Sequence, residues 1–455
     1  MLSKDLVSKL RKIFGDRIDD REGELKCHSL DSAGYTGYTY LVVYPECEEE
    51  VSELVKLCYK YNVPIYPQGG LSSLTGAAVP YGGIVVDMSM MDKILEISTE
   101  DMIVVVEPGI KLVDLNRILR KKGLYFPVDP ASQKVATIGG MIGTGAGGMR
   151  CIKYGVMRDW VYGLRVVIRD GIVLDIGAKT HKCRDGYDLV RLFIGSEGTL
   201  GIVTQATLRI TNYPRSRTRI LVNIQDLQLL GDVLKIARSG DWDISLLETI
   251  FEESTDILRR VFDDVLKPGI NVIIDVDGKS SRESAEELAQ HLTSIGCDAQ
   301  VLNDEMAEKV LEVRRKLASI IIKEGKLGSM GEDVTVPPSK IPLLIKYAKE
   351  ASKKYGLEVY FYGHAGDGNI HVRVQINEEA ERKKIEAYIK EVIKYAISLG
   401  GVVSGEHGIG NAKIDLLKYE FEVRGSPYVI ELFKGIKQLF DPKNIFNPGK
   451  IFRAD

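Results

Sequence analysis

A loop of glycines and hydroxyl residues, PQGGLSSLTG at 67–76, stands in the N-terminal half of the chain. Consecutive glycines leave backbone N–H groups uncovered, and the serines and threonine add hydroxyl donors, so the loop is suited to surround an anion such as a pyrophosphate. A plain surface loop is the alternative that this segment alone leaves open. The segments on either side of it therefore have to decide the fold.

Short strands separated by turns surround this loop. An acidic start at 48–50 predicts a helix to about Tyr61, and a second helix ends at Gly123. The strand candidates are YLVVYP (40–45), PIYPQ (64–68), GIVVDM (83–88), ILEIS (94–98), MIVVVEP (102–108), GLRVVIRDG (163–171) and IVLDIG (172–177). So many strands with few helices between them indicate an α+β domain rather than a doubly wound one.

Two further glycine-rich segments follow. GTGAGG at 143–148 matches the G-x-G-x-x-G dinucleotide fingerprint, but ATIGGM at 136–141 is a poor candidate for the buried strand that must precede it. We therefore predict a loop wrapped closely around a cofactor. GSEGTLGI at 195–202 predicts a tight turn that runs into a strand.

The pattern changes near 212–217, beyond which longer helices alternate with strands. This rhythm predicts a helix-covered antiparallel or mixed sheet, such as a ferredoxin-like cap, and a domain boundary at the change. At 455 residues the chain is long enough for two domains.

The composition excludes several classes of protein. The net charge of -3 offers no basic surface for nucleic acid. No apolar run is long enough to span a bilayer, and charges interrupt the N-terminal apolar residues, unlike in a secretory signal. Six scattered cysteines predict neither a disulfide framework nor a cysteine-based metal site. We expect a protein of the cytoplasm, or one peripheral to the membrane.

Three of the six histidines fall in two motifs near the C-terminus, GHAGDGNIH at 363–371 and SGEHG at 404–408. The glycines of the first motif make a reversing loop that can bring His364 and His371 together. Two imidazoles and a carboxylate suit zinc, with coordination positions left open.

Taken in order, these segments carry a resemblance. Together with VDPAS (128–132), Tyr154-Gly155 and LFIGSEG (192–198), they resemble the vanillyl-alcohol oxidase superfamily, in particular its D-lactate, glycolate and D-2-hydroxyglutarate dehydrogenases, from about residue 35 to 453. The resemblance implies a two-part FAD-binding domain at 1–212 with a C-terminal return at 441–455. It also implies an α+β substrate cap at 213–440 that carries a metal site.

The resemblance implies non-covalent FAD, because covalent members often carry a histidine in the first loop and this loop has none. Leu71 stands where a third glycine is common, and Gly145 stands where an asparagine is usual. The implied FAD-binding residues are Gly69, Gly70, Leu71, Ser72, Ser73, Gly76, Pro130, Thr137, Gly140, Gly148, Glu197, Gly198, Ile202 and Asn447.

For the chemistry, the resemblance implies a divalent metal, zinc in our prediction, on His364, His371 and Glu406. It makes His407 the catalytic base that receives the hydroxyl proton while a hydride passes to flavin N5. Arg314 matches the arginine that binds the substrate carboxylate, and a solvated helix face is the alternative for it.

The substrate expectation depends on two positions. The D-2-hydroxyglutarate enzymes carry a lysine just before the Asp-x-x-x-Pro strand, whereas residues 330–332 here are Met, Gly and Glu. This favours D-lactate or glycolate. Arg373, however, lies two residues after His371 and shares its face of a strand, so it could reach the distal end of a substrate. A surface ion pair is the alternative for Arg373.

Other functions remain open at this point. They are a D-2-hydroxyglutarate dehydrogenase, a flavin-binding subunit of a larger oxidase complex, a zinc hydrolase without flavin, and an ether-lipid synthase. The intact histidine and glutamate motifs argue against the subunit and the synthase. No haem or iron–sulfur motif is present, so the electron acceptor would be an electron-transfer flavoprotein, a quinone, oxygen or a partner subunit.

Overall fold

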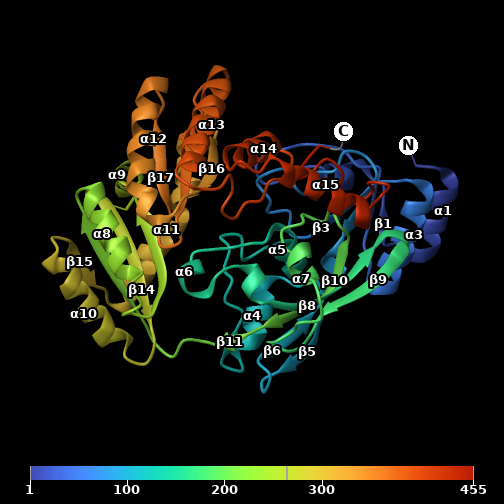
Figure 1. Ribbon diagram of the computed structural model, residues 1–455, viewed down its shortest axis with the longest axis horizontal. Coiled ribbons are helices and arrows are strands. Elements are labelled where there is room, and N and C mark those ends of the chain that lie inside the picture. The colour runs from blue at the N-terminus through green and yellow to red at the C-terminus, as the bar shows by residue number, and fades with distance from the viewer. Residues whose placement is uncertain (1, 263–264, 454–455) are drawn as a thin grey trace. The chain divides into compact units, whose positions relative to one another are not determined.

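The computed structural model describes residues 2–262 and 265–453, and the chain in it forms two compact units (Figure 1). Unit 1 comprises residues 1–147, 156–213 and 406–455, and unit 2 comprises 148–155 and 214–405. The domain ranges expected from the sequence differ from these units, because 406–440 lies in unit 1 and 148–155 in unit 2. Those domain ranges stay predictions.

Unit 1 begins with a four-stranded sheet in the order β1-β2-β4-β3, whose last three strands run parallel. The helices α1 (Lys4–Phe14) and α3 (Glu48–Tyr61) share a hydrophobic core with these strands. The predicted helix at 48–61 is confirmed. The strands are β1 (Ile18–Asp19), β2 (Leu41–Val43), β3 (Ile65–Gln68) and β4 (Ile84–Asp87).

The second sheet of unit 1 is antiparallel and five-stranded, in the order β5-β6-β10-β8-β9. Two of its connections are long: the one between β6 and β8 carries α4 (Leu112–Arg120) and α5 (Ile138–Thr144), and the one between β9 and β10 carries α7 (Leu189–Phe193). The other connections are short, as expected of an α+β domain. The strands are β5 (Ile94–Ser98), β6 (Ile103–Val106), β8 (Val161–Ile168), β9 (Ile172–Gly177) and β10 (Ile202–Arg209).

One local prediction is wrong. The residues around the G-x-G-x-x-G match begin as the helix α5 rather than as a loop, because Thr137 caps the helix by accepting from the N–H of Gly140. The helix ends at Gly145, which has a left-handed conformation. The expectation that no buried strand precedes the glycines is confirmed.

Unit 2 is built on a seven-stranded sheet in the order β15-β12-β14-β13-β17-β18-β16, and every pairing in it is antiparallel. Its first four strands along the chain lie in the order β15-β12-β14-β13, that of a ferredoxin-like unit, although a helix separates β13 from β14. The strands are β12 (Arg217–Ile224), β13 (Ile244–Ile250), β14 (Ile270–Asp277), β15 (Asp298–Val301), β16 (Ser329–Thr335), β17 (Val359–His364) and β18 (Asn369–Gln375). The predicted helix-covered antiparallel sheet is confirmed.

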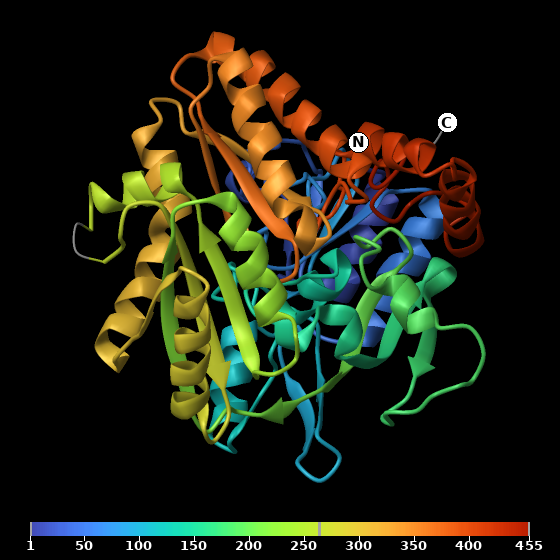
Figure 2. The same ribbon diagram turned by 60° about the vertical axis from the view of Figure 1, so that its left-hand side comes forward.

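Helices of unit 2 pack on this sheet. The helices α9 (Glu252–Arg259) and α11 (Asp304–Glu324) share a core with Ile250, Ile273 and Tyr362. Figure 2 shows α12 (Ile341–Tyr355) and α13 (Arg382–Ser398) side by side, and Tyr347 stacks on Tyr395 between them. The helices α6 (Cys151–Tyr154), α8 (Leu227–Ala237) and α10 (Ser281–Ser294) also contact the sheet. No helix among the described residues could span a bilayer.

Candidate active site

The hairpin of β17 and β18 brings the two histidines of GHAGDGNIH together. Tyr362 pairs with His371 and His364 with Asn369, and the two imidazole centroids lie 5.2 Å apart. Gly368 makes this turn possible, since its φ is 95° and an added Cβ would lie 2.0 Å from the carbonyl oxygen of Val336. The reversing loop predicted from the glycines is present.

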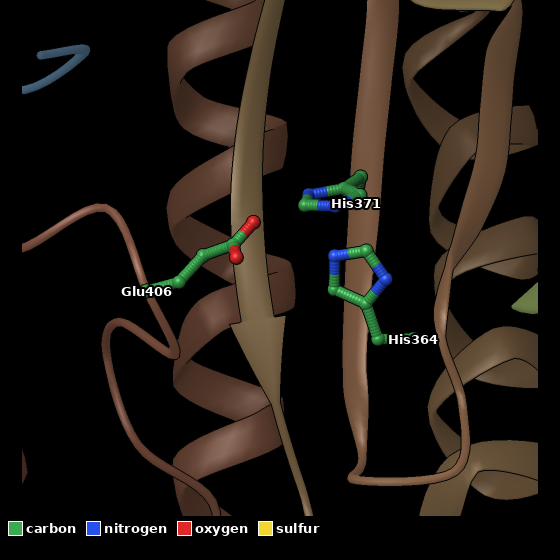
Figure 3. A group of neighbouring side chains, drawn as sticks. All are labelled: His364, His371 and Glu406. Atoms are coloured by element: carbon green, nitrogen blue, oxygen red, sulfur yellow. The ribbon is translucent and has the colours of Figure 1, made fainter. Parts of the chain in front are cut away.

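Glu406 joins the two histidines. The nearest ligand atoms of His364, His371 and Glu406 lie within 4.8 Å of one another, and Figure 3 shows the three side chains converging. Glu406 directly follows Gly405, whose N–H donates to the buried carboxylate of Asp333 at 2.7 Å. Two imidazoles and one carboxylate around a common point fit a zinc-type cation with open positions.

A fully buried carboxylate, Glu248 on β13, lies behind His364. It accepts from His364 Nδ1 and forms a 2.6 Å ion pair with Arg314. Burial raises the pKa of Glu248, but its interactions with His364 and Arg314 outweigh that effect, so the pKa lies below its usual value. Sequence reasoning missed Glu248, although a glutamate inside the apolar strand ISLLETI is the signal that could have found it.

Arg314 belongs to the buried side of α11, so the interpretation as a solvated helix face is wrong. Its guanidinium lies over the ring of Tyr362, 4.7 Å from the centroid. No acceptor for its buried Nε is present among the described residues. Arg314 therefore keeps a hydrogen-bond donor free in addition to its ion pair with Glu248.

Arg373 is half-buried on β18, on the face that it shares with His371. Its Nε donates to the hydroxyl of Tyr362 at 3.2 Å and its Nη1 donates to Ser329 Oγ at 2.9 Å. Both acceptors are neutral hydroxyls, and the structure shows no ion pair for Arg373 in the described part of the chain. The surface ion pair considered from the sequence is therefore absent.

Unit 1 contains a cavity bordered by the glycine-rich segments. Among its lining are Glu406 and His407. Most of the residues expected to bind FAD line it, namely Gly69, Gly70, Leu71, Ser72, Ser73, Pro130, Thr137, Gly140, Glu197, Gly198 and Ile202. Three others do not line it, namely Gly76, Gly148 and Asn447. The wall is largely backbone and small side chains, which suits a long, flat cofactor.

Close approach explains the glycines of the first loop. An added Cβ at Gly69 would lie 2.1 Å from Thr137 Oγ1, and one at Gly70 would lie 2.0 Å from the carbonyl oxygen of Val135. Leu71 has a φ of 52°, a left-handed conformation that explains why a glycine is common at this position in the family. The loop therefore has a shape that side chains would obstruct, as a pyrophosphate cradle requires.

Glu197 and Asn447 organise the C-terminal segment within unit 1. The buried carboxylate of Glu197 accepts from the N–H groups of Ile409 at 2.7 Å and Gly410 at 2.9 Å, and burial raises its pKa. Asn447 is buried and donates to the carbonyl oxygens of Ala77 and Glu197. These bonds hold the segment that carries His407 beside the cavity.

A lysine completes this network. Lys450 donates to the carbonyl oxygens of Gly76 and Val79 at 2.7 and 2.8 Å, next to the first glycine loop. Burial lowers its pKa to about 8. Gly76 therefore contributes its carbonyl to this anchor rather than a surface to the cavity.

Each half of the chain matches a known protein family. Residues 40–177 match the FAD binding domain family, and residues 213–451 match the C-terminal domain of the FAD linked oxidases. Among solved structures, p-cresol methylhydroxylase with substrate bound superposes on this chain with a TM-score of 0.80 at 18% sequence identity. The match covers 99% of this chain and 97% of that enzyme's chain. That similarity shows the fold.

Curated relatives place the chain more narrowly. Glycolate oxidase subunit GlcD of Bacillus subtilis is 33% identical over 100% of this chain and 98% of its own. A D-lactate dehydrogenase of Archaeoglobus fulgidus is 36% identical, and a D-2-hydroxyglutarate dehydrogenase of Stutzerimonas stutzeri is 32% identical, each over 91% of both chains. The protein belongs to the FAD-linked oxidase family of the vanillyl-alcohol oxidase superfamily, in the branch of the D-lactate, glycolate and D-2-hydroxyglutarate enzymes.

Proposed function

We propose that the protein is a dehydrogenase that oxidises a D-2-hydroxy acid, D-lactate or glycolate by preference, to the 2-oxo acid. The observation that carries the proposal is the convergence of His364, His371 and Glu406, with His407 next in sequence and lining the cavity. The relatives named for D-lactate, glycolate and D-2-hydroxyglutarate support the class of substrate.

In this proposal His364, His371 and Glu406 hold a divalent cation, zinc by preference. FAD would lie non-covalently in the cavity of unit 1. The cation would supply a Lewis acid for the substrate hydroxyl, and the flavin would supply the hydride acceptor at N5. His407 takes the hydroxyl proton, because an imidazole can act as a base near neutral pH.

Arg314 binds the substrate carboxylate in this proposal. Its unsatisfied Nε supports that role, because a buried guanidinium donor without an acceptor is costly unless a ligand supplies one. The preference for a small monocarboxylate rests on the absence of a lysine at 330–332.

A D-2-hydroxyglutarate dehydrogenase is the second candidate. It is favoured by Arg373, a half-buried guanidinium bonded to hydroxyls on the strand face of His371. A role as the flavin subunit of a larger oxidase complex is a third, suggested by the GlcD relative. The acceptor would be an electron-transfer flavoprotein, a quinone or a partner subunit. The six cysteines form no disulfide among the described residues, which suits a cytoplasmic location.

Anaerobic flavin spectra of the purified protein test the proposal. D-lactate or glycolate should bleach the flavin, L-lactate should not, and chelation should abolish the response until zinc is restored. Bleaching only by D-2-hydroxyglutarate would select the second candidate. A protein without a flavin spectrum, or one whose bleaching is indifferent to chelation, would contradict the proposal or its metal part, respectively.

A further inference from the structure

Glu248 is a buried carboxylate that the proposed reaction leaves unused. It is 0% exposed at the centre of the unit 2 sheet, and its neighbours along β13 are the apolar Leu247 and the buried Thr249. Burying a carboxylate is costly unless it is paired and hydrogen-bonded. Its position therefore needs an explanation, and its two partners supply one.

The first partner is His364, one of the three residues that converge in the candidate metal site. The Glu248 carboxylate contacts Nδ1 of this histidine. An ionised carboxylate can only accept, so His364 Nδ1 must carry the hydrogen, and Nε2 keeps its lone pair. A neutral imidazole with Nε2 free is the form that binds a metal ion, and an outer carboxylate both fixes the ring and raises its basicity.

The second partner is Arg314. Its Nη2 lies 2.6 Å from the other carboxylate oxygen of Glu248, and its guanidinium lies over the ring of Tyr362. Tyr362 in turn packs beside His371, with ring centroids 5.2 Å apart. One carboxylate thus holds a metal ligand with one oxygen and the proposed substrate-binding arginine with the other.

We propose that Glu248 is a positioning residue that orients His364 for metal binding and Arg314 for the substrate carboxylate. The inference rests on the metal site of the proposed function and goes beyond it by assigning a role to a residue that touches neither metal nor substrate. Glu248 sets metal affinity through the His364 contact, and it sets the Michaelis constant through the Arg314 contact.

Asp275 provides a matched control. It is also 0% exposed in the same sheet, and it pairs with Arg219 at 2.6 and 2.9 Å and with Arg150 at 3.1 Å, but no histidine in the described part of the chain bonds to it. Asp275→Asn therefore disturbs a buried ion pair of the same kind away from the histidines. Arg314→Met is the second comparison, because it removes the ion pair of Glu248 and leaves the contact with His364.

The experiment measures zinc affinity by competition with a chromogenic chelator, and the visible spectrum of bound Co²⁺, on purified flavin-loaded protein. Glu248→Gln should weaken zinc about 10- to 100-fold and change the Co²⁺ spectrum. Asp275→Asn should stay within about threefold of the unaltered protein. Arg314→Met should raise KM and keep zinc affinity within the same threefold limit.

Two results would overturn the inference, namely unchanged zinc affinity in Glu248→Gln, or an equal loss in Arg314→Met. If Glu248→Gln fails to fold, the double variant Glu248→Gln/Arg314→Met takes its place, because it removes both buried charges of the pair. Its zinc affinity is then compared with that of Arg314→Met. Equal zinc affinities of these two variants would contradict the positioning role of Glu248. Failure of the unaltered protein to bind zinc or Co²⁺ would instead contradict the proposed function, so the two failures are distinguishable.

Discussion

The two candidate sites of this protein are built from different parts of the chain. The cavity of unit 1 is formed mainly by backbone and small residues, such as Gly69 and Gly70, whose role is to leave room. The convergence of His364, His371 and Glu406 is formed by side chains, whose role is to supply specific atoms. The first kind of site depends on shape, and the second depends on residue identity.

This difference decides which substitutions each site should tolerate. Backbone N–H groups persist whatever the side chain, so a cradle fails when an added atom closes the space. A ligand or base fails when its functional atom is removed, even if the shape is kept.

His407→Asn should lower kcat/KM for the preferred 2-hydroxy acid by about 10²- to 10⁴-fold, because it removes the proposed base and keeps a side chain of similar size. Steady-state kinetics with an artificial acceptor measure the effect. The flavin content should stay unchanged, since the loops that line the cavity are intact. A loss below threefold would show that another group takes the proton.

Gly70→Val should remove most of the bound FAD, because the new side chain would displace Val135 and separate the two loops. The ratio of flavin absorbance to protein absorbance measures the loss. Gly435→Ala is the control, since an added Cβ there meets nothing within 4 Å. Full flavin occupancy in Gly70→Val would contradict the claim that the cavity of unit 1 depends on the absence of side chains.

Lys450→Met should alter how stability depends on pH. Burial lowers the pKa of Lys450 from its ordinary value of 10.5 to about 8 in the folded protein. The unfolded chain therefore binds more protons between these values, and the folded protein should gain up to about 3 kcal/mol relative to the variant as pH rises from 7 to 10.5. Urea unfolding at several pH values measures the gain, and parallel curves for the two proteins would contradict it.

Arg373→Ala should lower the catalytic efficiency for a C5 diacid about tenfold relative to that for a C3 monoacid. The reason is that Arg373 shares the strand face of His371 and is bonded only to hydroxyls in the contacts described above. Competition between D-lactate and D-2-hydroxyglutarate gives the ratio directly. An unchanged ratio would remove Arg373 from the substrate hypothesis.

Sequence reasoning predicted elements whose signals are local. The helix at 48–61 follows from its acidic start and its periodicity, and the reversing loop within 363–371 follows from its glycines. The order of motifs predicted most of the loop residues that line the cavity of unit 1. The helix at 138–144 was missed because glycines disfavour helices, and the cap by Thr137 is a single hydrogen bond that composition does not reveal.

The candidate site was less predictable where it depends on contacts distant in sequence. Glu248 and His364 are 116 residues apart, and no local pattern joins them. The buried position of Arg314 was equally hidden, because α11 carries charges on most of its turns and reads as a solvated helix. The positions of Glu248 and Arg314 are explained only by the sheet, which places β13 next to β17.

The path of the chain between the units has a consequence for biosynthesis. Residues 148–155 lie inside the sequence of unit 1 but belong to unit 2, where Arg150 bonds to Ser245 and Asp275. Residues 406–455 complete unit 1 only after all of unit 2 has been translated. A ribosome therefore completes the sequence of unit 2 before that of unit 1, so a premature stop codon within 406–455 would remove residues from unit 1 and leave the sequence of unit 2 whole.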